Sequence, residues 1–127
     1  MCGIIGLISE QEIDITHLNH LALHARQRGR DSSGLMYYDR GSYCVTRADY
    51  DIRQLLKKAN TLSTNVVLGH SRLITNGIAD NQPVVRDGIC VIHNGIIVND
   101  AVIWETLAVP RHFQIDTEVI IGITIKH

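Results

Sequence analysis

The second residue of the chain is a cysteine, and its place beside the amino terminus gives it a chemistry that an internal cysteine lacks. If Met1 is removed, Cys2 carries both a thiol and a free α-amine. Such an amine has a pKa of about 7.7–8.0, so it can serve as general base for the thiol, directly or through a water. Gly3 lets a substrate approach the backbone closely. The alternative is a small buried residue that begins a strand.

Two further segments have the residue types needed to bind or polarise a substrate. Arg72 follows an apolar segment, and its planar guanidinium suits a bidentate bond to a carboxylate. Thr75 adds a hydroxyl and backbone amides nearby. Asn94 and Gly95 can present one side-chain amide and one backbone N–H, the two donors of an oxyanion hole. Taken singly, each segment equally fits a surface turn.

Asp116 and Arg28 are the remaining charged candidates. Asp116 precedes an apolar segment, where its carboxylate can bind a substrate ammonium or act as the N-cap of a helix. Arg28 can pair with Asp31 and so fix the polar loop over residues 28–34 near a site. The alternative for that loop is a solvated connection between two elements.

Histidines offer two weaker possibilities. His20 and His24 have the i, i+4 spacing of a helical metal site, but no third ligand is evident, and we expect no metal. Cys2 paired with His70 or His93 as in papain stays open, although the usual context of such a nucleophile is absent. The chain has no Walker loop or dinucleotide fingerprint, so we expect no organic cofactor.

Composition excludes several classes of protein. The 127 residues, 45% hydrophobic and 20% charged, fit one globular domain over residues 1–127. Twelve basic and thirteen acidic side chains leave a net charge of −1, which predicts neither nucleic acid nor an anionic membrane as partner. No apolar segment approaches a membrane span, and no signal peptide is indicated. Three widely spaced cysteines favour a reducing, cytoplasmic setting.

The hydrophobic pattern predicts a layered α+β fold. Predicted strands cover residues 2–8, 35–38, 43–47, 66–70, 84–86 and 89–93, and predicted helices cover residues 14–27, 51–59, 100–108 and 117–126. Asp87 and Gly88 predict a type I′ hairpin turn. The last helix begins after Asp116 as its N-cap, and its many β-branched residues leave its second half open to a strand. Polar loops are expected over residues 28–34 and 72–83.

Six short motifs follow one another along the chain. They are residues 1–6 (MCGIIG), 28–34 (RGRDSSG), 69–73 (GHSRL), 81–84 (NQPV), 93–99 (HNGIIVN) and 116–119 (DTEV). Together and in this order they resemble the class II glutamine amidotransferase domain of the N-terminal nucleophile hydrolase superfamily. The resemblance implies an α+β fold, a four-layer αββα sandwich of two antiparallel sheets with helices outside.

The resemblance also implies a glutaminase half-reaction. Cys2, freed by loss of Met1, would attack the side-chain amide carbon of L-glutamine, and the α-amine would move the proton. The Asn94 side chain and the Gly95 N–H would hold the oxyanion. Ammonia would leave, and water would then release glutamate from the thioester. No metal or organic cofactor is needed.

Residue by residue, the same resemblance assigns the binding of substrate. Arg72 would bind the α-carboxylate of glutamine and Asp116 its α-ammonium. Arg28 would support the nucleophile loop. The pocket would be lined by Thr75, Asn76 and Gly77.

Domains of this type pass ammonia to a synthase domain, and the resemblance leaves the acceptor open. The segment from Arg72 to Gly77 looks closest to the Arg-Trp-Ala-Thr-His-Gly segment of the glucosamine-6-phosphate synthase branch, with Leu73 and Asn76 in place of Trp and His. Arg72-Leu73 and the NQP motif are similar to the asparagine synthetase branch. A phosphoribosyl-pyrophosphate amidotransferase branch also exists.

Domains of the family continue well beyond Asp116, so we expect a domain that is short at its C-terminus, with a synthase missing from the chain or supplied in trans. An incomplete sandwich would expose a sheet edge, which invites association, including a homo-oligomer. A catalytically idle module that binds glutamine or a partner is the second hypothesis. The third is a different N-terminal nucleophile hydrolase, such as a small-amide acylase, which would not need Arg72 or Asp116.

Overall fold

Strands of the protein pair into two antiparallel sheets in the computed structural model, which describes residues 1–59, 63–73 and 81–127. The larger sheet has the order β1-β4-β2-β3, and the smaller is the hairpin β5-β6. The strands are β1 (Gly3–Ile8), β2 (Ser32–Asp39), β3 (Ser42–Ala48), β4 (Val66–Arg72), β5 (Val84–Arg86) and β6 (Ile89–Val91).

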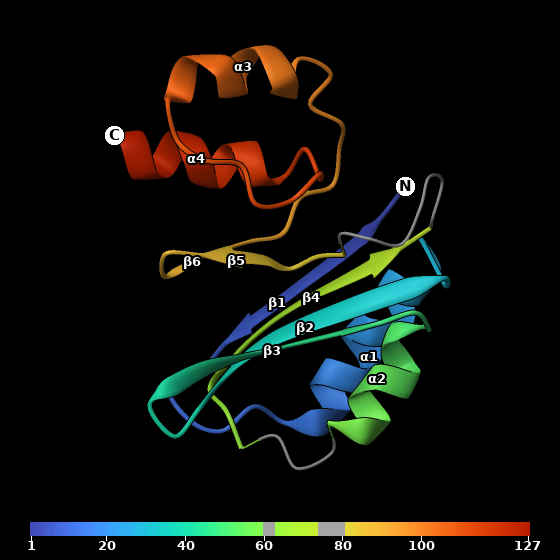
Figure 1. Ribbon diagram of the computed structural model, residues 1–127. Helices are drawn as coiled ribbons and strands as arrows, with labels where there is room; N and C mark the ends of the chain where they lie inside the picture. The colour runs from blue at the N-terminus through green and yellow to red at the C-terminus, as the bar shows by residue number, and fades with distance from the viewer. Residues whose placement is uncertain (60–62, 74–80) are drawn as a thin grey trace.

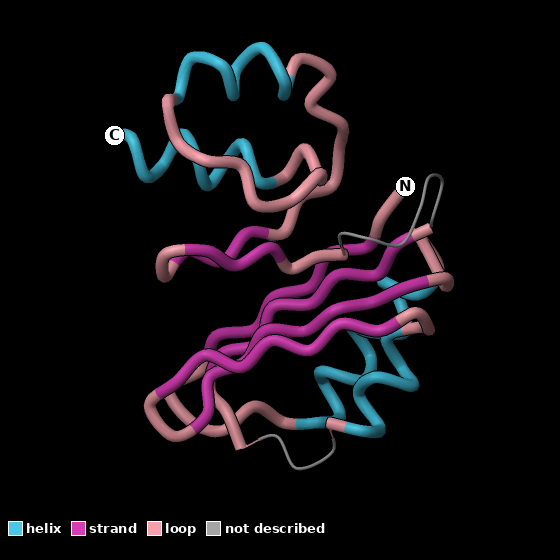
Figure 2. The backbone as a smooth tube through the Cα atoms, viewed as in Figure 1, coloured by secondary structure: helices cyan, strands magenta, loops and turns pink. Residues whose placement is uncertain are grey.

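Helices form the two outer layers of the sandwich. Helices α1 (Ile15–Arg26) and α2 (Ile52–Lys58) cover one face of the larger sheet. The hairpin lies on the other side, with α4 (Glu118–Lys126) packed on β6 and α3 (Asp100–Leu107) on α4 (Figures 1 and 2). This arrangement confirms the predicted α+β sandwich of two antiparallel sheets. Within the described ranges, no helix is long and apolar enough to cross a membrane.

The main core lies between the larger sheet and helices α1 and α2. Apolar side chains of one sheet face meet one stripe of each helix, as the alternating and helical patterns predict. Its fully or nearly fully buried members are Ile5, Leu18, Ala22, Ala25, Leu35, Ile52, Leu55, Leu56 and Val67. Asp14 caps α1 by accepting the Thr16 N–H at 2.7 Å, and Asp51 caps α2 by accepting the Arg53 N–H at 2.9 Å.

Strand β2 begins three residues earlier than predicted, so the expectation of a polar loop up to Gly34 is wrong. The buried Ser33 hydroxyl donates to the Tyr50 carbonyl at 2.6 Å, which satisfies it inside the sheet. Gly34 lies against the second layer, where a Cβ would be 1.8 Å from the Gln82 carbonyl oxygen. These residues are small because both faces of the strand are crowded there.

The chain before β5 attaches the second layer to the larger sheet. The Arg47 guanidinium donates from Nε and Nη2 to the Pro83 carbonyl at 2.8 and 2.6 Å. Asn81 Nδ2 donates to the Ser33 carbonyl at 3.0 Å. The NQPV motif therefore holds the hairpin to β2 and β3.

The predicted hairpin turn is confirmed, with φ of 50° at Asp87 and 78° at Gly88. Strand β6 ends at Val91 and not at His93, because the His93 N–H donates at 2.5 Å to Gln82 Oε1. The last segment is helical to Lys126, although its composition also permits a strand. Ile121 of this helix is fully buried in a second core with Val84, and this packing outweighs the β-branched propensity.

Candidate active site

Cys2 and Asn94 meet although 92 residues separate them. Cys2 immediately precedes β1 and is half-buried, and its backbone N–H donates to Asn94 Oδ1 at 3.2 Å. Asn94 lies just beyond β6, in the chain that leaves the hairpin toward α3 (Figure 1). Met1 is 80% exposed, so it is accessible to removal. The nitrogen that contacts Asn94 is the one that becomes the α-amine when Met1 is lost.

The segment that follows Asn94 also carries Asp116. The Ile97 N–H donates to Asp116 Oδ2 at 2.7 Å. The predicted role of Asp116 as the N-cap of the last helix is wrong, because Thr117 occupies that position and makes no side-chain capping bond. The half-buried Asp116 carboxylate instead joins the start of α4 to the chain beyond Gly95. A carboxylate that accepts one such bond can accept further hydrogen bonds.

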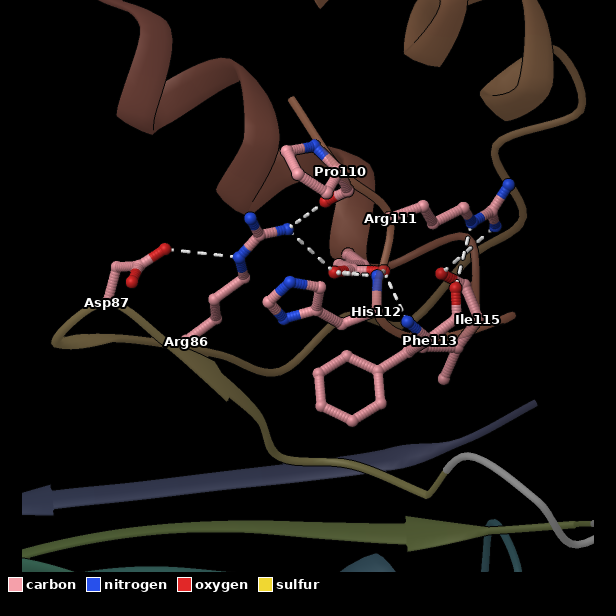
Figure 3. A network of polar contacts seen from close by, with 8 residues as sticks. Arg86, Asp87, Pro110, Arg111, His112, Phe113 and Ile115 are labelled. Carbon is pink, nitrogen blue, oxygen red and sulfur yellow. Dashed lines mark hydrogen bonds and ion pairs between the residues drawn. The ribbon is translucent and has the colours of Figure 1, made fainter. Parts of the chain in front are cut away.

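A buried ion pair fixes the beginning of α4, as Figure 3 shows. Glu118 is fully buried and accepts from Arg86 Nη1 at 3.0 Å and from the backbone N–H groups of His112 and Phe113 at 3.0 and 2.7 Å. Arg86 Nη1 also donates to the Pro110 carbonyl at 2.6 Å. The contacts link β5, the loop before α4 and the first turn of α4, two residues after Asp116.

His70 lies in the layer between the two sheets. It is fully buried, pairs with Gly34 of β2, and by strand alternation faces away from the core residue Val67. Burial, together with the charges of Arg72 and His93, lowers the pKa of His70 to about 4, while the His93 backbone opposes the shift. Neither ring nitrogen of His70 has a hydrogen-bond partner among the described residues.

Arg72 ends β4, and Gly95 packs on a histidine ring. Arg72 is half-buried, and its carbonyl accepts the Asp31 N–H at 3.1 Å. A Cβ at Gly95 would lie 2.7 Å from His93 Nε2, so the exposed Gly95 backbone rests against that imidazole. Sequence reasoning named His70 and His93 only as possible partners of Cys2 and did not foresee these contacts. The sequence features that could have indicated these positions are the alternation along β4 for His70 and the Asn-Gly pair after β6 for His93.

Other predicted residues lie apart from these contacts. Arg28 is exposed after α1, with its N–H on the Ala25 carbonyl at 3.0 Å, and no hydrogen bond between described residues joins its side chain to Cys2 or Asn94. Thr75, Asn76 and Gly77 lie outside the described residues. Within residues 1–59, 63–73 and 81–127, no three His, Cys, Asp or Glu side chains gather into a metal site.

Comparison with known proteins adds independent information. No family model matches the chain. It is 33% identical over its whole length to a glutamine–fructose-6-phosphate aminotransferase of Rhizobium meliloti, of which it covers 22%. It is 34% identical over 93% of its length to that of Rhizobium leguminosarum bv. viciae, of which it covers 20%. The chain thus spans about a fifth of the length of these curated relatives.

A solved structure has the same fold. Glutamine phosphoribosylpyrophosphate amidotransferase from B. subtilis superposes with a TM-score of 0.76 at 20% sequence identity, over all of this chain and 30% of the other. The two sheets and outer helices described above therefore have the fold of that amidotransferase. By sequence the chain is a homologue of glutamine–fructose-6-phosphate aminotransferases over about a fifth of their length, and by structure it shares the fold of a second glutamine amidotransferase.

Proposed function

We propose that the chain is a glutaminase domain that hydrolyses L-glutamine to glutamate and ammonia. The observation that carries this proposal is the contact between the Cys2 backbone nitrogen and Asn94 Oδ1 at 3.2 Å. It joins the nucleophile and the oxyanion-binding residue that the resemblance assigns. The names of the relatives, which are aminotransferases that use glutamine, agree with it.

The reaction begins at the amino terminus. After loss of Met1, the α-amine of Cys2 takes the thiol proton, and Sγ attacks the side-chain amide carbon of glutamine. The amide oxygen becomes an oxyanion, for which Asn94 Nδ2 and the Gly95 N–H are the donors. The protonated amine gives its proton to the leaving nitrogen, the carbon–nitrogen bond breaks, and ammonia departs. Water then attacks the thioester, which releases glutamate and restores the thiol.

Recognition of the amino-acid head group falls to two charges of opposite sign. In the proposal, the Arg72 guanidinium binds the α-carboxylate as a bidentate pair, and Asp116 binds the α-ammonium. The hydrogen bond from the Ile97 N–H to Asp116 Oδ2 supports this role, because it fixes the carboxylate to the segment that carries Asn94 and Gly95. The family resemblance alone assigns Thr75, Asn76 and Gly77, which lie outside the described residues, to substrate binding, and Arg28 to the support of the loop that carries the nucleophile.

We further propose that residues 1–127 are one glutaminase domain whose ammonia serves a synthase domain or subunit, in a cytoplasmic setting. The relatives favour an amino-sugar phosphate as acceptor, because fructose 6-phosphate appears in their names. An asparagine-type acceptor is distinguished by assaying ammonia transfer with each synthase supplied in trans. A second copy of the chain as partner is tested by the mass of the protein in solution.

Release of ammonia and glutamate from glutamine by purified protein tests the function, after intact mass has established that Met1 is lost. We expect turnover in the wild type and in Cys44→Ala, a matched control at a half-buried cysteine of β3, and none in Cys2→Ala. Turnover that survives Cys2→Ala contradicts the proposal. Binding of glutamine without ammonia release favours a binding module instead, and equal hydrolysis of amides without the amino-acid head group favours an acylase.

A further inference from the structure

Two side chains, those of Gln82 and His93, contact the short segment that carries the proposed oxyanion donors. His93, Asn94 and Gly95 follow β6 and leave the hairpin without further strand pairing. Asn94 and Gly95 are both exposed, so little of their own surface packs against the protein. Exposed loop segments are ordinarily among the least rigid parts of a fold. A reacting oxyanion, in contrast, needs donors already in place.

His93 is the residue of this segment that points inward. Its N–H is held by Gln82 Oε1 at 2.5 Å, and Gln82 is itself 4% exposed. Its ring lies directly under Gly95, where a Cβ would approach Nε2 to 2.7 Å. The Nδ1 atom of His93 is buried and has no hydrogen-bond partner among the described residues. The ring therefore acts on Gly95 by shape and packing.

His70 of β4 lies on the face of the larger sheet that is turned away from the main core. Its imidazole is fully buried, and the His93 backbone and side chain both influence its charge. On the outer side, Asn94 Oδ1 accepts the Cys2 N–H. The segment is thus supported by Gln82 and by its own His93 ring.

We propose that His93 is a positioning residue, whose ring, with its backbone held by Gln82, sets the Gly95 N–H and the Asn94 side chain at their places beside Cys2. The inference rests on the proposed function, because the importance of these donors comes from the oxyanion they would hold. His93 does not touch the reacting atoms in this proposal. It acts in the transition state through Gly95, so its loss affects turnover more than substrate binding.

Steady-state kinetics of His93→Ala, His93→Phe and His20→Ala test the proposal. His20 is an exposed histidine of α1 and provides the matched control. We expect His93→Ala to lower kcat roughly 10- to 100-fold, with KM changed less than about threefold. His93→Phe keeps a flat ring under Gly95 and is expected to restore most of the lost kcat. His20→Ala keeps the wild-type values.

Several results would overturn the inference. One is an unchanged kcat in His93→Ala, with or without a raised KM. Another is a kcat of His93→Phe no higher than that of His93→Ala, when thermal unfolding shows that both variants are folded. If His93→Ala does not fold, the kcat and KM of His93→Phe against wild type decide, and a kcat below one tenth of wild type contradicts the packing role.

Failure of the proposed function is distinguishable from failure of this inference. If the wild type releases no ammonia, nuclear magnetic resonance of the Gly95 amide and the Asn94 side-chain amide replaces the kinetics. We expect His93→Ala to shift both resonances, with His93→Phe shifting them less and His20→Ala not at all. Resonances that are unmoved in His93→Ala contradict the positioning role whatever the activity.

Discussion

Neutral His70 between the two sheets makes the stability of the protein depend on pH. Burial, with the charges of Arg72 and His93, lowers the pKa of His70 from 6.5 to about 4 in the folded protein. The unfolded chain binds a proton at this residue below about pH 6.5, and the folded chain does so only near pH 4. The contribution of His70 is therefore fully present above pH 6.5 and is lost as the pH falls toward 4.

The size of the effect follows from the shift in pKa. Each unit corresponds to about 1.4 kcal/mol, so the full contribution of His70 is about 3 kcal/mol. Between pH 7.5 and pH 5.0, the part lost is about 2 kcal/mol. His70→Gln removes the titrating group and retains a polar side chain of similar length. The variant should therefore lose about 2 kcal/mol less than the wild type over this interval.

Urea unfolding of both proteins at pH 7.5 and 5.0 measures the difference. The free energy of unfolding at pH 5.0 is compared with that of the same protein at pH 7.5, so the absolute cost of the substitution cancels. Direct titration of the His70 ring by nuclear magnetic resonance provides a check that needs no variant. Equal pH dependence in the two proteins, or titration of His70 near 6.5, refutes the assignment of His70 as a buried neutral histidine.

Three substitutions test the contacts that hold the layers together. Glu118→Gln removes the buried charged partner of Arg86 and leaves it the more exposed Asp87, and we expect urea unfolding to show a loss of about 3 kcal/mol. Gly34→Ala places a Cβ against the Gln82 carbonyl, so calorimetry should show a lower melting temperature from a cost of about 1–3 kcal/mol. Asp51→Ala removes the cap of α2, and a loss of about 1 kcal/mol is expected from urea unfolding. A change below about 0.3 kcal/mol in any of them contradicts the corresponding contact.

Local features of the fold were predictable because they depend on neighbours in sequence. Asp14 and Asp51 cap their helices, and Asp87 with Gly88 makes the hairpin turn, each through contacts within three residues or through its own backbone dihedrals. The start of β2 was not predictable in the same way. Ser33 is satisfied by the Tyr50 carbonyl, which is 17 residues away, and no local pattern indicates that partner.

The candidate site shows the same division. Residue types alone made Cys2 a candidate nucleophile and Asn94 a candidate donor, and the family resemblance linked them, but their spacing could not place them in contact. The sequence places Glu118 at the start of the predicted helix over residues 117–126. Its buried pairing with Arg86, however, depends on how the hairpin packs against α4. The support of Gly95 by His93 is likewise visible only once the second layer is in place.

The proposed reaction requires a covalent intermediate on the amino-terminal Cys2, and detecting this intermediate tests the proposal directly. Protein that has lost Met1 is mixed with glutamine, quenched in acid and digested, and the peptides are analysed by mass spectrometry. We expect a glutamyl thioester on the peptide that begins with Cys2, and no adduct in Cys2→Ala or in protein that retains Met1. Release of ammonia with the adduct on another residue, or from protein that retains Met1, contradicts the proposal.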